Sequence, residues 1–392
     1  MPYSLPDNAS PFTLRIPDVE YERFHDLLRL SRVGPLTWEN QHADGSYGIP
    51  HEWLVSTKEY WLNKFDWRAQ EKRINSFPNY KMTVQDEKGD IDLHFVALFS
   101  EKEKEKEDVI PIVLLHGWPG SFLEFLPMLD LIRNKYEPAQ LPVHLIVPSL
   151  PGYTLSSGPP QDQAWFGEDA ARIIDKALKM LGFDRYVVQG GDVGSLIASL
   201  LGTTYDSVIG VHLNLLPSLD QVEVNDPGLT EMERKAVQRG KERFQTPTTG
   251  AAIMNSTRPA TIGAVMSSNP LALLAWIGEK FLEWPEKDLS IDEILTDVSL
   301  YFFTDCFPRC SYTYRSTFLV KPPFCPPFID KPFGYSWFMH ELVPGPKKVV
   351  ERKGRLVFYR QHENGGHFAA LERPMEFLQD IEDFMEVVLR EQ

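Results

Sequence analysis

From residue 109 onward, short apolar runs alternate with amphipathic segments. The continuous apolar runs predict strands buried on both faces, and apolar residues at a spacing of three and four predict helices. Strand and helix in alternation predict an α/β fold with a mostly parallel central sheet and helices on both faces. The predicted strands lie at 109–115, 144–147, 186–189, 208–215, 333–340 and 355–361, and predicted helices begin near Ser121, Gly167, Ser195 and Pro374, with a kink or restart at Pro127.

The same pattern divides the chain into three parts. Residues 1–105 form an irregular, aromatic-rich N-terminal meander that we expect to pack on the core, because its tryptophans need a surface to cover. Residues 106–217 and 333–392 carry the alternating pattern of the α/β core. Residues 218–332 lack buried-strand runs, include a predicted helix at 270–281 and form a helical lid inserted into the core.

Composition narrows the class of protein. With 43% hydrophobic residues the chain has ample material for a core, and a net charge of −15 disfavours nucleic acid and anionic membrane surfaces as partners. No apolar stretch reaches the roughly 18 residues of a membrane helix, and the first twenty residues do not resemble a signal peptide, so we expect no membrane anchor and a cytoplasmic protein. The three cysteines, Cys306, Cys310 and Cys325, fit neither a disulfide framework nor a metal site.

The segment Gly190-Gly191-Asp192-Val193-Gly194 lies between a predicted strand and a predicted helix. This is the arrangement of a nucleophile elbow, with Asp192 where hydrolases of this architecture usually have serine. An ordinary tight turn is the alternative. A phosphate-binding loop is excluded because the glycine spacing differs from G-x-G-x-x-G and an acid would repel phosphate.

Elbow hydrolases place the acid and then the histidine after the nucleophile. His367, in a glycine-rich loop after the last predicted strand, is the candidate base, and Glu341, after the preceding strand, is the candidate acid that orients it. His340 and His362 are structural or surface alternatives. The backbone N–H groups of Trp118 and Val193 are the candidate oxyanion hole, since one follows the first core strand and the other follows the nucleophile.

Aspartate in place of serine changes the chemistry. A carboxylate opens a strained or activated carbon by displacement and leaves an alkyl ester, which a histidine-activated water then hydrolyses. Epoxides and alkyl halides are both electrophiles that a carboxylate could open. An epoxide leaves as an alkoxide and needs a proton donor. A halide needs N–H donors, and Val193 offers it no side-chain donor. Tyr312 and Tyr314 in the lid are candidate proton donors, with packing under the lid as the alternative role.

At these residues the sequence resembles epoxide hydrolases of the microsomal type, and more narrowly their soluble fungal branch. The likeness covers nearly the whole chain. It implies an α/β-hydrolase fold, with Asp192 as nucleophile, His367 as base, Glu341 as orienting acid and Tyr314 as lid proton donor. The motifs that carry it are Trp67-Arg68, Phe77-Pro78, 116–120, 190–194, Ser256-Thr257-Arg258-Pro259, 312–315 and the loop around His367.

One position departs from the family pattern. The resemblance implies a second lid tyrosine eight residues before Pro259, and the chain has Ala251 there. A hydrolase that uses Tyr314 alone, a cyclase that opens the epoxide with the substrate's own hydroxyl, and a catalytically impaired ligand-binding protein all remain open. We expect the first: an enzyme of detoxification or secondary metabolism that takes a small-molecule epoxide and water, without a metal or organic cofactor. A homodimer is left open.

Overall fold

The computed structural model describes residues 3–102, 109–216, 222–244, 250–318, 327–343 and 345–391. A nine-stranded sheet in the order β1-β2-β3-β5-β4-β6-β7-β8-β9 runs through its centre. The six strands from β4 onward are mutually parallel, and β1–β3 extend the sheet in antiparallel fashion. The strands are β1 (Ala9–Pro11), β2 (Asn79–Val84), β3 (Ile91–Leu98), β4 (Pro111–Leu115), β5 (His144–Pro148), β6 (Tyr186–Gly190), β7 (Val208–Leu213), β8 (Ile329–Phe338) and β9 (Gly354–His362).

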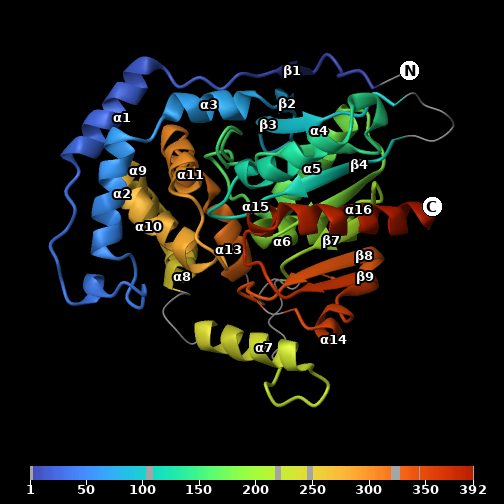
Figure 1. Ribbon diagram of the computed structural model, residues 1–392. Coiled ribbons are helices and arrows are strands. Elements are labelled where there is room, and N and C mark those ends of the chain that lie inside the picture. The colour runs from blue at the N-terminus through green and yellow to red at the C-terminus, as the bar shows by residue number, and fades with distance from the viewer. Residues whose placement is uncertain are drawn as a thin grey trace.

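The central strands are buried on both faces, as their continuous apolar sequences predicted. Every residue of β4, β5, β6 and β7 is buried. Neighbouring positions of β7 face helices on opposite sides, since Gly210 lies against Val388 of α16 and Val211 lies against Gly202 of α6. The helices that cover the sheet in Figure 1 are α4 (Leu126–Lys135), α5 (Gly167–Met180), α6 (Asp192–Thr204), α15 (Ala369–Glu372) and α16 (Pro374–Arg390). The α/β-hydrolase fold predicted from the sequence is thus confirmed.

The N-terminal segment is more regular than its sequence pattern predicted. It contains α1 (Asp18–Leu30), the short helix η1 (Glu39–Gln41), α2 (His51–Asn63) and α3 (Trp67–Asn75), and its strands complete one side of the central sheet. Strand pairing between β3 and β5 joins residues about fifty positions apart, and such pairing leaves no local signal in the sequence.

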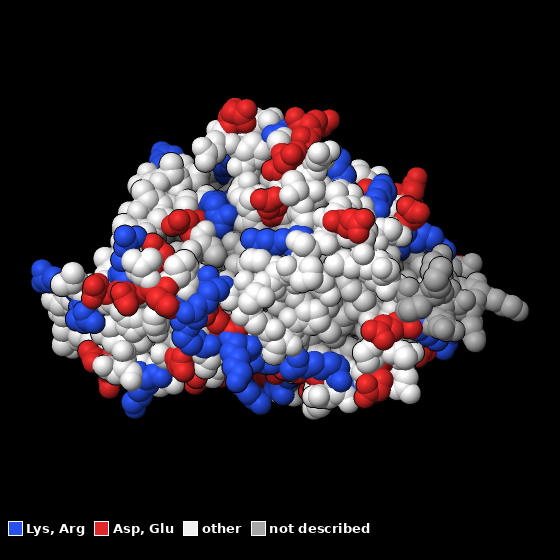
Figure 2. All heavy atoms as spheres, turned by 90° about the horizontal axis from the view of Figure 1, so that it is seen from above, with Lys and Arg blue, Asp and Glu red and all other residues white. Residues whose placement is uncertain are grey.

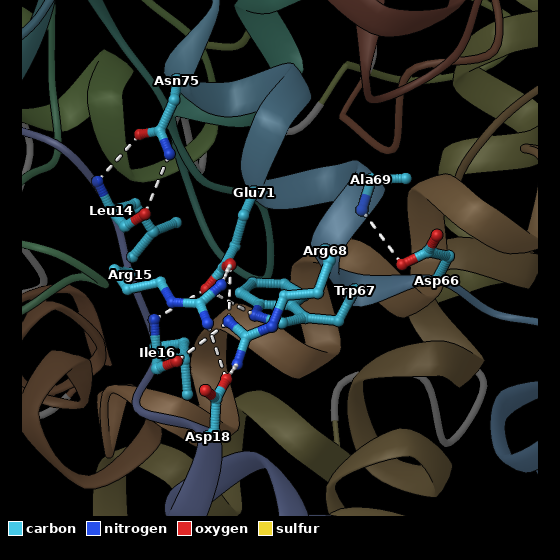
Figure 3. Close-up of polar contacts among 10 residues, drawn as sticks. All are labelled: Leu14, Arg15, Ile16, Asp18, Asp66, Trp67, Arg68, Ala69, Glu71 and Asn75. Carbon is cyan, nitrogen blue, oxygen red and sulfur yellow. Dashed lines mark hydrogen bonds and ion pairs between the residues drawn. The ribbon is translucent and has the colours of Figure 1, made fainter.

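A buried carboxylate ties this segment together (Figure 3). Glu71 of α3 accepts hydrogen bonds from the backbone N–H of Ile16 at 2.7 Å and the indole N–H of Trp67 at 3.0 Å. Arg68 pairs with the same carboxylate at 2.6 Å and also reaches Asp18 at the start of α1. Because the charge of Glu71 is both paired and hydrogen-bonded, it can be buried without a large desolvation penalty.

The helices of residues 250–318 lie between the central sheet and the helices α1 and α2, whereas the helix of residues 231–244 lies apart from α1 and α2, below β8 and β9 (Figure 1). They are α7 (Glu231–Phe244), α8 (Gly250–Thr257), α9 (Pro259–Ser268), α10 (Pro270–Glu283), α11 (Ile291–Phe303), α12 (Cys306–Cys310) and α13 (Tyr312–Phe318). The next strand, β8, begins at Ile329, four residues before the predicted boundary. Cys325 lies outside the described residues.

Within the described ranges, no single helix is long and apolar enough to span a membrane. The helices α9 and α10 taken together have the length and apolar composition of a membrane span, but their axes are bent by 116° at the break between them.

The surface charge is unevenly distributed on the face seen in Figure 2. Lys and Arg side chains gather along the lower border with Asp and Glu among them, and a broad central area is uncharged.

Candidate active site

Asp192 occupies the sharp turn between β6 and α6, with a positive φ of 45°. The turn is tight: a Cβ added at Gly190 would lie 2.2 Å from the carbonyl oxygen of Gly194, and one added at Gly194 would lie 2.1 Å from that of Leu115. Only glycine fits at these two positions, which agrees with the elbow reading of the sequence. The predicted helix is present, but it begins three residues before the predicted start near Ser195. The helix begins at Asp192, because the Ser195 N–H already bonds to the Gly191 carbonyl at 3.0 Å.

The predicted histidine and acid converge on this turn. The Nε2 atom of His367 lies 3.4 Å from Oδ2 of Asp192, and its Nδ1 atom lies 2.7 Å from Oε1 of Glu341. His367 comes from the loop between β9 and α15, and Glu341 lies three residues beyond the end of β8, so the parallel strands deliver all three groups to one edge of the sheet. The two alternative histidines lie elsewhere: His340 is next to Glu286 and His362 pairs with Asp380.

Two carboxylates flank the His367 ring and set its charge. Burial favours the neutral imidazole, but the charge and hydrogen bond of Glu341, together with Asp192, outweigh it and raise the pKa of His367 well above its ordinary value. The resting site therefore holds an imidazolium between two carboxylates. Loss of the charge on Asp192 removes one of the two supports and lowers the pKa of His367, so the ring can release its proton and become available as a neutral base.

The backbone N–H of Trp118 donates a hydrogen bond to Oδ1 of Asp192 at 2.8 Å. Trp118 lies in the loop after β4, as the sequence predicted for one half of an oxyanion hole. Val193 follows Asp192 in the first turn of α6, where backbone N–H groups have no acceptor within the helix. The ends of β4 and β6 thus bring both candidate donors to the carboxylate.

Of the two candidate lid phenols, Tyr314 is the one near the carboxylate. Its ring meets the Trp118 ring edge-on, with centroids 5.3 Å apart. Burial, followed by the charge of Asp192, raises the pKa of Tyr314 well above its ordinary value, so its proton is available at neutral pH. The hydroxyl of Tyr312 instead donates to the Pro151 carbonyl at 2.8 Å, which gives that phenol the packing role left open by the sequence. Ala251 lies in α8 and supplies no polar group.

A half-buried glutamate beside the triad was missed by the sequence reading. Ser121 and Glu124 have capping-box spacing, but Ser121 instead donates to Asp297 at 2.8 Å and accepts from the Leu123 N–H. Glu124, Asp192 and His367 line a cavity of about 20 Å³, which is room for one water molecule. Burial, followed by smaller charge effects, raises the pKa of Glu124 to about 8, so this carboxyl is neutral at pH 7. No sequence signal marks such a group, because its burial depends on packing.

A second cavity, of about 140 Å³, shares Glu124 with the first and extends toward Asp292 and Arg73. Across the part of the chain that the structure describes, no cluster of three or more His, Cys, Asp or Glu side chains could hold a metal ion.

These features define an α/β-hydrolase with an aspartate at the elbow, and comparison with known proteins identifies its family. Residues 9–125 match the family described as epoxide hydrolase N terminus, and residues 110–245 match the alpha/beta hydrolase fold family. A protein of Dothistroma septosporum, provisionally named an epoxide hydrolase, is 39% identical over 98% of this chain and 92% of its own length.

Comparison with solved structures indicates the same family. The structure of Aspergillus niger epoxide hydrolase is 47% identical and has a TM-score of 0.90, with 98% of this chain and 99% of that chain covered. Juvenile hormone epoxide hydrolase from Bombyx mori has the same fold, with a TM-score of 0.86 at 24% identity, over 98% of this chain and 96% of that one. The chain belongs to the epoxide hydrolase family and is a hydrolase.

Proposed function

We propose that the chain opens an epoxide to a vicinal diol through an alkyl ester on Asp192, which water activated by His367 then hydrolyses. One observation carries the proposal: a single carboxylate has the His367 imidazole 3.4 Å from one oxygen and a backbone N–H 2.8 Å from the other. The first contact places a base beside the future ester, and the second places a donor on its carbonyl oxygen.

In the first step, Oδ2 of Asp192 attacks an epoxide carbon while that carbon's bond to the ring oxygen breaks. The developing alkoxide takes the proton of Tyr314. Asp192 is now a neutral ester, so the pKa of His367 falls and the ring can release its proton, which restores the phenol. The proton count therefore balances within the site.

In the second step, neutral His367 takes a proton from a water molecule that attacks the ester carbon. The Trp118 and Val193 N–H groups hold the charge on the carbonyl oxygen. As this intermediate collapses, its bond to the alkyl oxygen breaks and that oxygen takes the second proton of the water, so the diol is released, the oxygen of water stays on the Asp192 carboxylate and His367 is again an imidazolium. The cavity beside Glu124 has room for such a water on the His367 side of the carboxylate.

Single turnover in ¹⁸O-labelled water tests the proposal. With enzyme in excess over p-nitrostyrene oxide, the first diol should carry no label and the peptide that contains Asp192 should gain one labelled oxygen. Label in the first diol would contradict the ester and indicate direct attack by water. An Asp192→Asn variant is the control and should give neither diol nor labelled peptide.

The cytoplasmic location and a homodimer stay predictions.

A further inference from the structure

The loop that carries His367 is held in place through its backbone. Residues 365–368 lie between β9 and α15, outside any strand or helix, so their N–H groups need acceptors elsewhere. All four of these N–H groups donate hydrogen bonds, at distances of 2.7 to 3.2 Å. The position of the His367 ring therefore depends on the groups that accept these bonds.

Glu372, in the short helix α15, supplies two of the acceptors. Its Oε2 atom accepts from the Gly366 N–H at 3.0 Å, and its Oε1 atom accepts from the Phe368 N–H at 3.0 Å. These two N–H groups flank His367 in the chain. One carboxylate thus holds the backbone immediately before and immediately after the proposed base.

The loop between α10 and α11, in the lid, supplies the other two acceptors. The Glu286 carboxylate accepts from the Gly365 N–H at 2.7 Å. The Trp284 carbonyl accepts from the His367 N–H at 3.2 Å. The N–H of Glu286 in turn donates to Oε2 of Glu372 at 2.7 Å, so this carboxylate joins the lid loop to the His367 loop.

The two loops are packed closely where they meet. A Cβ added at Gly366 would lie 2.6 Å from the backbone nitrogen of Glu286 and 2.7 Å from the carbonyl oxygen of Trp284, so a larger residue does not fit. The ring of Trp284 also meets the His367 ring edge-on, with centroids 4.9 Å apart. The lid therefore contacts both the backbone and the ring of the proposed base.

The exact place of the ring matters for hydrolysis of the ester. The Nε2 atom of His367 lies 3.4 Å from Oδ2 of Asp192. A base acts only when it is within hydrogen-bond reach of the proton that it takes, here a proton of the attacking water. A displacement of about 1 Å can lower a rate by roughly 10²-fold. The hydrogen bonds that fix the loop therefore bear directly on the second step.

A carboxylate suits this task better than a neutral group. Among the described residues, all the hydrogen bonds that the Glu372 side chain accepts come from backbone N–H groups. Such bonds are stronger to a charged oxygen than to a neutral one. Glutamine has the same shape but only one oxygen, so its NH₂ group would face a backbone N–H on one side. This replacement should loosen the loop without leaving a cavity.

We propose that Glu372 is a positioning residue for hydrolysis of the Asp192 ester: it joins the His367 loop to the lid loop and holds the imidazole where it can take a proton from water. This inference rests on the proposed function, because it assigns a support to that function's base. Its effect is confined to the second step, since formation of the ester depends on the Asp192 carboxylate and the Tyr314 proton.

The test measures the two steps separately by quenched flow with p-nitrostyrene oxide. Glu372→Gln should slow ester hydrolysis by roughly 10- to 100-fold and change ester formation by less than about twofold. Glu372→Asp, which keeps the charge, should restore part of the rate. Glu382→Gln is the matched control and should leave both rates unchanged, since Glu382 is also half-buried but bonds to Lys135 and Tyr136.

Hydrogen exchange followed by mass spectrometry tests the backbone contacts themselves. A peptide that covers residues 363–371 should exchange faster in Glu372→Gln than in the wild type, while a peptide from α16 keeps its rate. A general loss of stability would instead raise exchange in both peptides. Glu286→Gln weakens the same link from the lid side, so it should also slow ester hydrolysis, and it replaces Glu372→Gln if that variant does not fold.

Three results would overturn the proposal. These are equal slowing of both steps, ester hydrolysis in Glu372→Gln at the wild-type rate, and unchanged exchange in the His367 loop. If the wild type forms no ester at Asp192, the proposed function fails instead, and the two failures are therefore distinguishable.

Discussion

Replacement of Glu124 by glutamine should make the protein progressively more stable than the wild type as pH rises. The pKa of Glu124 is raised by burial from 4.5 to about 8 in the folded protein. Between these values the native state holds a proton that the unfolded state has released. Stability therefore falls as pH rises through this interval, by about 1.4 kcal/mol per pH unit.

The interval spans roughly 3.5 pH units, so the wild type should lose on the order of 5 kcal/mol between pH 4.5 and pH 8 at this group alone. Glutamine has the same shape and stays neutral, and it removes this loss. Any fixed cost of the amide shifts the stability of the variant equally at every pH. Only the change of the difference in unfolding free energy with pH tests the prediction.

Urea unfolding of the wild type and Glu124→Gln at about pH 5, 6, 7 and 8 gives that slope. The difference in unfolding free energy should grow in favour of the variant by about 1 kcal/mol or more per unit. Glu22→Gln, at an exposed position of α1, is the control and should give a flat difference. A flat difference for Glu124→Gln as well would refute the claim that this carboxyl is neutral beside the triad at pH 7.

Three further substitutions test other parts of the structure. Glu341→Gln should lower the rate of ester hydrolysis by roughly 10²- to 10⁴-fold, with ester formation much less affected, in quenched-flow assays of ester and diol; an equal loss in both steps would count against a role through His367. Ala251→Tyr should raise the rate of ester formation about tenfold, measured by stopped flow, because it adds a donor for the alkoxide, and an unchanged or lower rate would show that no donor is missing. Glu71→Gln should lower the unfolding free energy by about 1.5–3 kcal/mol in urea titrations, because Arg68 and the Trp67 and Ile16 N–H groups lose a charged acceptor; an unchanged value would show that the contacts in Figure 3 contribute little.

Local patterns in the sequence were sufficient to predict the fold of the core and the order of its candidate catalytic residues. Continuous apolar runs marked the parallel strands, and glycine spacing marked the turn at Asp192, because both depend on residues next to one another in the chain. His367 and Glu341 could be placed because parallel strands end at a common edge, so their order in the chain fixes where they meet.

The missed features depend on contacts between distant segments. The joining of β2 and β3 to the central sheet has no local signature, and neither has the position of Glu124 beside Asp192 and His367. Glu124 had a sufficient local explanation as a capping residue, which concealed its place beside His367.

The mass of the Asp192 peptide in a His367→Gln variant tests the central claim most directly. Without the imidazole, the ester should form and then persist, so protein treated with p-nitrostyrene oxide and digested should contain the Asp192 peptide heavier by one whole epoxide. The Asp192→Asn/His367→Gln double variant should show no such increase. An unmodified Asp192 peptide from the single variant, or the added mass on another residue, would contradict a covalent role for this carboxylate.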